Sequence, residues 1–412
     1  MSDNGKHNYG CFLLIEDCIQ KKGLIRGPFG GSLKKDFFVQ SGYSVYEQRN
    51  AIYNDFTKSR YFIDESLFKK LERFKVKKGD LIVSCSGTIG KIAEVPNNFN
   101  QGIINQALMI IRINEEKIDK SFFFQIFKSS SFQNRIIKST QGGAMKNMIG
   151  ISDFKKIKLL VPEKIEQQKI AQILLQWDEA IETTQSLIKQ LKLRKKGLLQ
   201  KCLSGKKRLA GFNEKWVQRK LSYYLKTSRD KNSNAVYNKN DVLSVSGEFG
   251  IVNQIKFQGR SFAGASVLNY GIVNNGDVVY TKSPLKANPY GIIKVNKGKA
   301  GIVSTLYAVY KCKETLDGTF IDYYFQLDDN LNRYLRPLVQ KGTKNDMKIN
   351  NEKVLIDPVC FPKLEEQRAL SSFFMNIDNE IQTSINYLEN LKMQKKGLMQ
   401  QLLTGQKRLK ID

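Results

Sequence analysis

The side chains that most often carry out chemistry are scarce in this 412-residue chain. A single histidine, His7, leaves little scope for imidazole acid–base catalysis. The six cysteines form no C-x-x-C pair and no even framework, so a structural zinc site is not expected. No acidic cluster suggests a metal-dependent nuclease. Scattered thiols are typical of a reducing compartment, and they predict a cytoplasmic location.

Three short stretches contain parts of catalytic motifs. Residues 87–91, Gly-Thr-Ile-Gly-Lys, have their glycines too close together for the phosphate loop G-x-x-x-x-G-K-[ST], and Ile92 replaces the required hydroxyl residue. Asn288-Pro-Tyr290 lacks one proline of the N-P-P-Y motif of adenine methyltransferases. Residues 262–266 are an incomplete F-x-G-x-G. A methyltransferase centre within this chain is therefore not expected, although a self-contained DNA-modifying enzyme is one alternative class.

Basic and polar residues in glycine-containing loops are the better candidates for function. Lys and Arg can hold phosphates, and Asn, Gln, Ser and Thr can read base edges. Each residue, taken alone, could equally be an ordinary solvated loop residue. The candidates for contact with a nucleic acid, should one be the partner, are Lys34, Lys35, Ser86, Thr88, Lys91, Gln141, Lys146, Asn147, Lys282, Lys286, Asn288, Tyr290, Lys341, Thr343, Lys344 and Asn345.

The net charge of +28 suggests a polyanionic partner. Residues 1–160 carry 26 basic and 15 acidic side chains, and residues 211–360 carry 22 and 13, so the excess is spread over both large segments. A generally lysine-rich composition is the alternative explanation. No stretch approaches the ~18 apolar residues that a membrane span needs, so no membrane association is expected.

A long segment occurs twice in the chain, once after each set of these loops. Residues 161–209 and 361–409 match without a gap at 18 of 49 positions. Their apolar residues recur at alternating steps of four and three, which is the pattern of a coiled-coil seam, and the seam skips Lys195 and Lys395 at the same place in both copies. The predicted seam residues are Ile170, Leu174, Trp177, Ile181, Ile188, Leu191, Leu370, Phe374, Ile377, Ile381, Leu388 and Leu391.

Each copy predicts one long helix, which begins after Pro162 or Pro362 and ends near Gly205 or Gly405. Gly197 and Gly397 lie inside these helices, and a kink or a close helix contact is plausible there. One such helix cannot bury its own apolar stripe, so we expect the two copies to pair in antiparallel fashion. Packing of each helix on its own domain alone is the alternative.

The two large segments share an order of elements while their side chains differ. Each has a Gly-Asp turn (Gly79-Asp80, Gly276-Asp277), strands, an aromatic-rich helix, a basic glycine loop and a short strand leading into the repeat helix. Such divergence on a common frame is expected when two domains share a scaffold and differ in what they recognise.

The duplicated segments, which end in K-K-G-L-x-Q-x-L-[ST]-G, resemble the specificity subunit of type I restriction–modification systems. The resemblance extends over the whole chain and includes S-G-T-I-G at residues 86–90 and the second-domain start with Trp216 and Leu221. It implies a non-catalytic DNA-recognition subunit, active in phage defence, whose two target-recognition domains each read half of a bipartite asymmetric site. The helices would set the spacer and dock two modification subunits.

The resemblance also implies restriction subunits as partners, and it assigns S-adenosylmethionine, ATP and magnesium to the partners, with no cofactor in this chain. Polar residues at the helix starts, which also suit the helix dipole, become candidates for contacts with partner subunits: Glu166, Gln167, Gln168, Glu366, Gln367 and Arg368.

The sequence therefore predicts an α/β (α+β) protein with pseudo-two-fold symmetry. Two target-recognition domains, residues 1–160 and 211–360, alternate with two helical segments, residues 161–210 and 361–412, which form long antiparallel coiled-coil helices. The alternative function is a non-specific nucleic-acid adaptor with a coiled-coil hinge, which would bind specific and random DNA alike.

Overall fold

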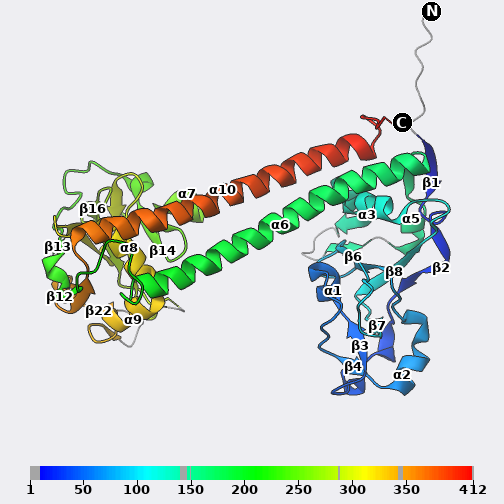
Figure 1. Ribbon diagram of the computed structural model, residues 1–412, viewed down its shortest axis with the longest axis horizontal. Helices are drawn as coiled ribbons and strands as arrows, with labels where there is room; N and C mark the ends of the chain where they lie inside the picture. The colour runs from blue at the N-terminus through cyan, green and yellow to red at the C-terminus, as the bar shows by residue number, and fades with distance from the viewer. Residues whose placement is uncertain (1–9, 140–145, 149, 286–287, 342–346, 411–412) are drawn as a thin grey trace, which may run out of the picture. The chain divides into compact units, whose positions relative to one another are not determined.

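Figure 1 shows the computed structural model of the chain, which describes residues 10–139, 146–148, 150–285, 288–341 and 347–410. Helices and strands are mixed throughout, so the predicted α/β class is confirmed. The chain divides into two compact units, Met1–Gln185 with Tyr387–Asp412, and Ser186–Asn386. Each unit contains one globular domain, the first part of one long helix and the last part of the other.

The first unit is built around an antiparallel four-stranded sheet in the order β2-β8-β5-β6. The apolar residues of β5 and β8 point alternately to the two faces. Leu81 and Val83 join a core with α3, whereas Ile82 joins a second core with Tyr46 and Phe56. Both faces are thus covered, which explains why these strands read as unbroken apolar runs. The bounds are β2 Ile19–Arg26, β5 Leu81–Ser84, β6 Ile92–Glu94, β8 Leu108–Ile113 and α3 Lys120–Lys128.

The second unit repeats this frame with a four-stranded sheet in the order β13-β20-β17-β18. Val278 and Tyr280 of β17 face the main core, and Val279 between them faces a smaller one. In both units a short strand pair links the domain to its long helix, β1 with β11 and β12 with β23. The bounds are β1 Cys11–Leu14, β11 Lys158–Val161, β12 Val217–Lys220, β13 Leu225–Thr227, β17 Val278–Thr281, β18 Ile292–Val295, β20 Tyr307–Cys312 and β23 Pro358–Phe361.

Outside this frame the two domains differ. The first carries a three-stranded sheet, β4-β3-β7, in which β3 and β7 run parallel, together with α1 and α2. The second carries a β14–β15 hairpin, the pair β16–β19 and α7. The bounds are β3 Tyr43–Tyr46, α1 Gln48–Tyr53, β4 Phe62–Ile63, α2 Glu65–Lys70, β7 Gly102–Ile104, β14 Leu243–Ser246, β15 Gly250–Asn253, α7 Gln254–Gln258, β16 Gly271–Val273 and β19 Gly301–Val303.

The shared Gly-Asp turns have the same construction in both domains. Gly79 and Gly276 adopt positive φ angles of 77° and 84°, a conformation that glycine adopts without strain. The carboxylate of Asp80 accepts a hydrogen bond from the backbone N–H of Lys77 at 2.9 Å, and Asp277 accepts one from Asn274 at 2.7 Å. The turn therefore closes on itself before each central strand.

The aromatic-rich segments differ from the prediction, because each forms two helices instead of one. In the first domain the break falls at Ser129, whose extended backbone ends α3 and whose hydroxyl accepts a hydrogen bond from the Phe132 N–H. In the second the break falls at Leu327. The bounds are α4 Ser130–Ile136, α8 Gly318–Gln326 and α9 Asp328–Leu335, and the remaining elements are β9 Ile137–Ser139, β10 Lys146–Met148, α5 Ile151–Lys155, β21 Gln340–Lys341 and β22 Met347–Lys348.

The two repeats form the long helices α6, Lys164–Cys202, and α10, Leu364–Leu403. All predicted seam residues are buried except Trp177 and Ile181, which are half-buried. Within the first unit the start of α6 shares a core with the end of α10, through Ile170, Leu174 and Leu402. Within the second unit the end of α6 shares a core with the start of α10, through Leu199 and Leu370. Start meets end in each unit, which is an antiparallel arrangement.

Gly197 and Gly397 do not mark a close helix contact. Both lie within continuous helices, and a Cβ atom at either position would meet nothing within 4 Å. The suggestion of a close helix approach at these glycines is therefore wrong.

Candidate nucleic-acid interface

The candidates for DNA contact in the first domain lie mainly on exposed turns. Lys34 and Lys35 are exposed at the start of a single 3-10 turn, Lys35–Phe37. Thr88 and Lys91 are exposed in the turn between β5 and β6. Ser86 of the same turn is half-buried, and its carbonyl oxygen accepts a hydrogen bond from the Gln48 side chain. This turn therefore presents a hydroxyl and an ammonium group to solvent from a fixed backbone.

The basic glycine loops correspond to hairpins at matching places. Lys146 and Asn147 lie on β10, which pairs with β9, and Lys341 lies on β21, which pairs with β22. The other candidates in these loops, together with Lys286, lie outside the described residues: Gln141, Thr343, Lys344 and Asn345.

The second-domain candidates near β17 are less exposed than the sequence suggested. Lys282 is half-buried, and burial lowers the pKa of its ammonium group. Tyr290 is half-buried. Asn288 is buried, and its amide donates a hydrogen bond to Asp328 at 2.7 Å. Asn288 thus ties a turn to α9, and its choice as an exposed base-reading residue is corrected: a buried, bonded amide does not face a groove.

Sequence reasoning missed a group of exposed aromatic residues in the second domain. Phe249, in the β14–β15 turn, is 60% exposed and lies 5.5 Å from Phe257 of α7, measured between ring centroids. The guanidinium of Arg260 lies 4.6 Å from the ring of Phe262, which is also exposed. The available signal was a run of phenylalanines among glycine and basic residues with no helical or strand periodicity.

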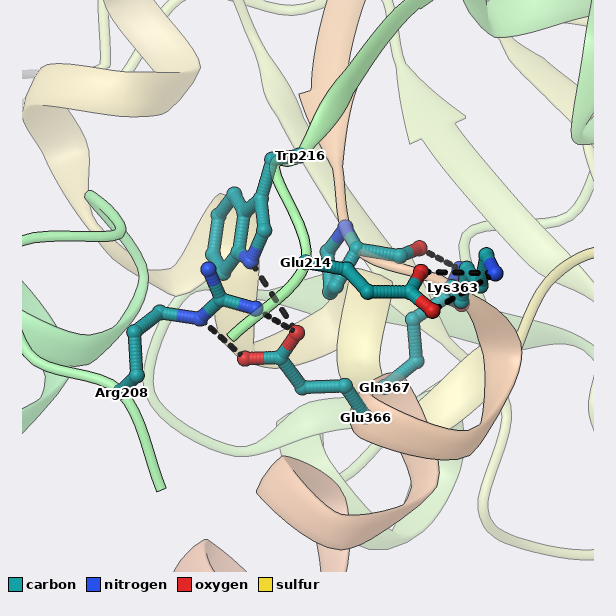
Figure 2. A network of polar contacts seen from close by, with 7 residues as sticks. Arg208, Glu214, Trp216, Lys363, Glu366 and Gln367 are labelled. Carbon is teal, nitrogen blue, oxygen red and sulfur yellow. Dashed lines mark hydrogen bonds and ion pairs between the residues drawn. The ribbon is translucent and has the colours of Figure 1, made fainter. Parts of the chain in front are cut away.

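The proposed partner contacts at the helix starts need correction, because four of the six residues are buried within the chain. Glu366 of α10 forms a salt bridge with Arg208, which follows the end of α6, with an Nε–Oε1 distance of 2.6 Å. The indole N–H of Trp216 donates to the same carboxylate at 3.2 Å (Figure 2). The Arg208 guanidinium also lies over the Trp216 ring. A hydrogen bond to Glu366 raises the pKa of Arg208.

The first unit holds the equivalent pair. Glu166 is fully buried and accepts hydrogen bonds from the Arg408 side chain at 2.9 and 3.1 Å. Gln167 and Gln367 are buried as well, and each binds the domain of its own unit. Only Gln168 and Arg368 are exposed, so only these two remain candidates for a partner contact.

Ion pairs occur at the two positions where a lysine interrupts the apolar seam. Lys195 lies 2.6 Å from Asp378 in the second unit, and Lys395 lies 2.6 Å from Asp178 in the first. Burial acts to raise the pKa of the Asp178 carboxyl, but Lys128, Gln125 and Lys395 together hold it below its usual value. A buried polar pair within an apolar seam favours one register of the helices over its neighbours.

Within the described ranges, no group of three or more His, Cys, Asp or Glu side chains could hold a metal ion. In the same ranges each helix is too short or too polar to cross a membrane.

Comparison with known proteins decides the family. Residues 30–193 match the model of the type I restriction modification DNA specificity domain. The chain is similar to the type I restriction–modification specificity subunits in this segment and, through curated relatives, along most of its length. DNA sequence recognition is the role that this similarity indicates.

Two similar curated proteins come from Methanocaldococcus jannaschii. The putative type I restriction enzyme MjaX specificity subunit is 23% identical over 385 residues, covering 86% of this chain and 84% of the relative. The type I restriction enzyme MjaVIII specificity subunit is 24% identical over 326 residues, covering 75% of each chain. The predicted resemblance to specificity subunits is thus confirmed.

Solved structures support the fold. The S subunit of a type I restriction–modification system from M. genitalium superposes with a TM-score of 0.54 at 15% identity, covering 100% of this chain and 99% of that chain. The HsdS subunit from Thermoanaerobacter tengcongensis gives a TM-score of 0.50 at 14% identity, covering 98% and 100%. The chain therefore shares the fold of these S subunits, with two mixed helix-and-strand domains and two long helices.

Proposed function

We propose that each globular domain of this chain reads one half of a bipartite, asymmetric DNA site. The observation that carries this proposal is the common frame with different additions. Both domains keep the four-stranded sheet, the Gly-Asp turn and the paired helices, whereas β3, β4 and α2 occur in one and the β14–β15 hairpin in the other. Two readers of the same half-site would not need different additions.

The excess of basic residues supports DNA as the partner. It is present in both large segments, and the exposed residues Lys34, Lys35, Thr88 and Lys91 lie on turns that a duplex can reach. Phosphate contacts of this kind position a protein on DNA, and base contacts then give specificity.

The long helices would set the number of base pairs between the two halves and dock two modification subunits. Their continuous length and the ion pairs that fix their register support a rigid spacer. Restriction subunits would join the complex for cleavage. S-adenosylmethionine, ATP and magnesium would then act in these partners, in the cytoplasm, while this chain selects the site without catalysing a step.

The test is a methylome. The chain is co-expressed with the modification subunit of its own operon in a methylation-free host, and N6-methyladenine is mapped by single-molecule sequencing. A split, asymmetric motif that requires this chain is the expected result. A soluble complex with no new methylation would refute the proposal and favour the non-specific adaptor, which the overall charge alone would also allow.

A further inference from the structure

The β14–β15 hairpin of the second domain ends in a turn whose side chains face solvent. Residues 247–249, Gly-Glu-Phe, connect the two strands, and Gly250 resumes the pairing with a positive φ of 71°. Glu248 is exposed, and Phe249 is 60% exposed. A Cβ atom at Gly247 would meet nothing within 4 Å. The turn therefore has open space around it, which a second molecule can occupy.

The domain holds this turn in a fixed conformation. The hydroxyl of Ser246 accepts hydrogen bonds from the backbone N–H groups of Glu248 at 3.3 Å and Phe249 at 3.2 Å. At the other end of the hairpin, Leu243 is buried in the smaller core of the central sheet. The ring of Phe257 on α7 lies 5.5 Å from that of Phe249 and supports it. A carboxylate and an aromatic ring thus leave the hairpin next to each other, from a backbone that is already ordered.

Basic side chains lie beside the hairpin on a helix that is bonded to it. The Gln254 side chain at the start of α7 donates a hydrogen bond to Ser244 of β14 at 3.1 Å. Lys256 of this helix and Arg260 just beyond it are exposed. Such residues hold phosphates at the edges of a groove. A protein partner shared by both domains is a poorer match, because this hairpin belongs to the additions that the first domain does not share.

The geometry points to the hairpin tip as a reader of the major groove, in which Glu248 selects a cytosine and Phe249 selects a thymine of a neighbouring base pair. The major groove admits a two-stranded ribbon. A carboxylate accepts hydrogen bonds and donates none, and the N4 amino group of cytosine is a donor without the N7 acceptor that lies beside the amino group of adenine. An aromatic ring gains from contact with the methyl group of thymine.

The acidic side chain also decides where on the duplex the tip would lie. Phosphates repel a carboxylate, so Glu248 would add nothing to a contact with the DNA backbone. At the base edges the same charge is useful, because it meets an amino group there. Lys256 and Arg260 would hold the phosphates on the side of α7, while the tip enters the groove between the strands.

This inference rests on the proposed function, since it names bases that the second domain would read. It confines the effect of the tip to one half of the site. Changes at Glu248 and Phe249 should therefore leave the first half and the spacer as they are.

The experiment selects duplexes from a random pool with the full chain bound to the modification subunit of its own operon, and the bound DNA is sequenced. The test variant is Glu248→Gln, which keeps the size of an exposed side chain and can bond adenine at N6 and N7. The matched control is Glu314→Gln, at an exposed acidic residue of the same unit between β20 and α8. In parallel, wild type and Phe249→Ala are titrated with a selected duplex in which uracil, which lacks the methyl group, replaces each thymine of the second half.

We expect Glu248→Gln to replace a cytosine of the second half by adenine, or to lower the preference for that cytosine about tenfold, while the control leaves the whole motif unchanged. Uracil should weaken wild-type binding about fourfold, the contribution of one buried methyl group, and should not weaken binding of Phe249→Ala further.

An unchanged motif for Glu248→Gln, a change in the first half, or a uniform loss of binding to all sequences would overturn the inference. Equal sensitivity of wild type and Phe249→Ala to uracil would overturn the role of the ring. A split motif that the variant does not alter would refute this inference alone. A motif confined to the second half, and changed by the variant, would refute bipartite reading alone, and selection of no motif by wild type would refute both.

Discussion

The buried salt bridge at the start of α10 should contribute more to stability than its counterpart at the start of α6. The side chain of Glu366 is 4% exposed and that of Arg208 is 22% exposed, with Trp216 packed on the pair. Replacing Glu366 with Gln leaves the Arg208 charge in a poorly solvated place. Breaking one partner of a buried pair costs roughly 3–5 kcal/mol, and the partial exposure of Arg208 puts our expectation near about 3 kcal/mol.

The matched variant is Glu166→Gln in the first unit. Glu166 is equally buried, but the side chain of Arg408 is 39% exposed, so water can solvate its charge better than that of Arg208. The expected cost is about 1–2 kcal/mol, between the values for surface and buried pairs. The exposed pair Lys363–Glu214, also visible in Figure 2, serves as the control, and Glu214→Gln should not change stability measurably.

Differential scanning calorimetry measures these costs. For a unit of this size each kcal/mol lowers the unfolding temperature by roughly 2–4 °C, so Glu366→Gln should lower one transition by about 6–12 °C. Hydrogen exchange should localise the loosening to residues 203–216 and the start of α10. Equal losses for the two variants, or a larger loss for Glu166→Gln, would refute the argument that solvation of the arginine decides the cost.

Four further variants test other features. Gly197→Ala and Gly397→Ala should each raise stability by up to about 1 kcal/mol, because a Cβ meets nothing within 4 Å in either helix, and a lower melting temperature would contradict this. Asp178→Asn should remove a pH dependence of folding stability. The pKa of Asp178 is held below 3.8, so the stability that its charged form contributes is complete above pH 3.8 and is lost as the pH falls through the lowered pKa. Melting temperatures from pH 6 to pH 2.5 should therefore converge for wild type and variant at the acid end, and a constant difference would count against the ion pair with Lys395. Phe249→Ala should weaken binding of the cognate duplex several-fold without changing stability, and unchanged binding in a fluorescence-anisotropy titration would exclude the aromatic group from the interface.

The helical part of the fold could be predicted from sequence because its signals are periodic and occur twice. The apolar seam indicated the helices, and the prolines and glycines at their ends (Pro162, Gly205, Pro362, Gly405) predicted the helix bounds within a few residues. The skipped positions Lys195 and Lys395 were visible, but their ion pairs with Asp178 and Asp378 could not be inferred, since the partners lie on the other helix, far away in sequence. Antiparallel pairing was inferred from the need to bury two stripes, and contacts within each unit agree with it.

The side chains of the candidate site were much harder to predict, because burial depends on packing that a single sequence does not encode locally. From the sequence Asn288 is expected in an exposed loop, yet its side chain is buried and donates a hydrogen bond to Asp328. Glu166 and Glu366 look like ordinary acidic residues of a first helical turn, yet arginines beyond the end of the opposite helix bind them. The break at Ser129 was also missed, because a serine between aromatic residues fits a continuous helix as well as a capped one.

The attachment of each domain to its helix explains how two different readers can share one scaffold. The side-chain oxygen of Gln167 accepts a hydrogen bond from the Asp119 N–H ahead of α3 at 2.7 Å, and that of Gln367 accepts one from the Asp317 N–H ahead of α8 at 2.9 Å. Both glutamines also donate to the proline carbonyl five residues earlier. These contacts use backbone atoms of the domain, so they tolerate any sequence that keeps the helix start in place. The loops of the two domains can therefore diverge freely while the attachment stays the same.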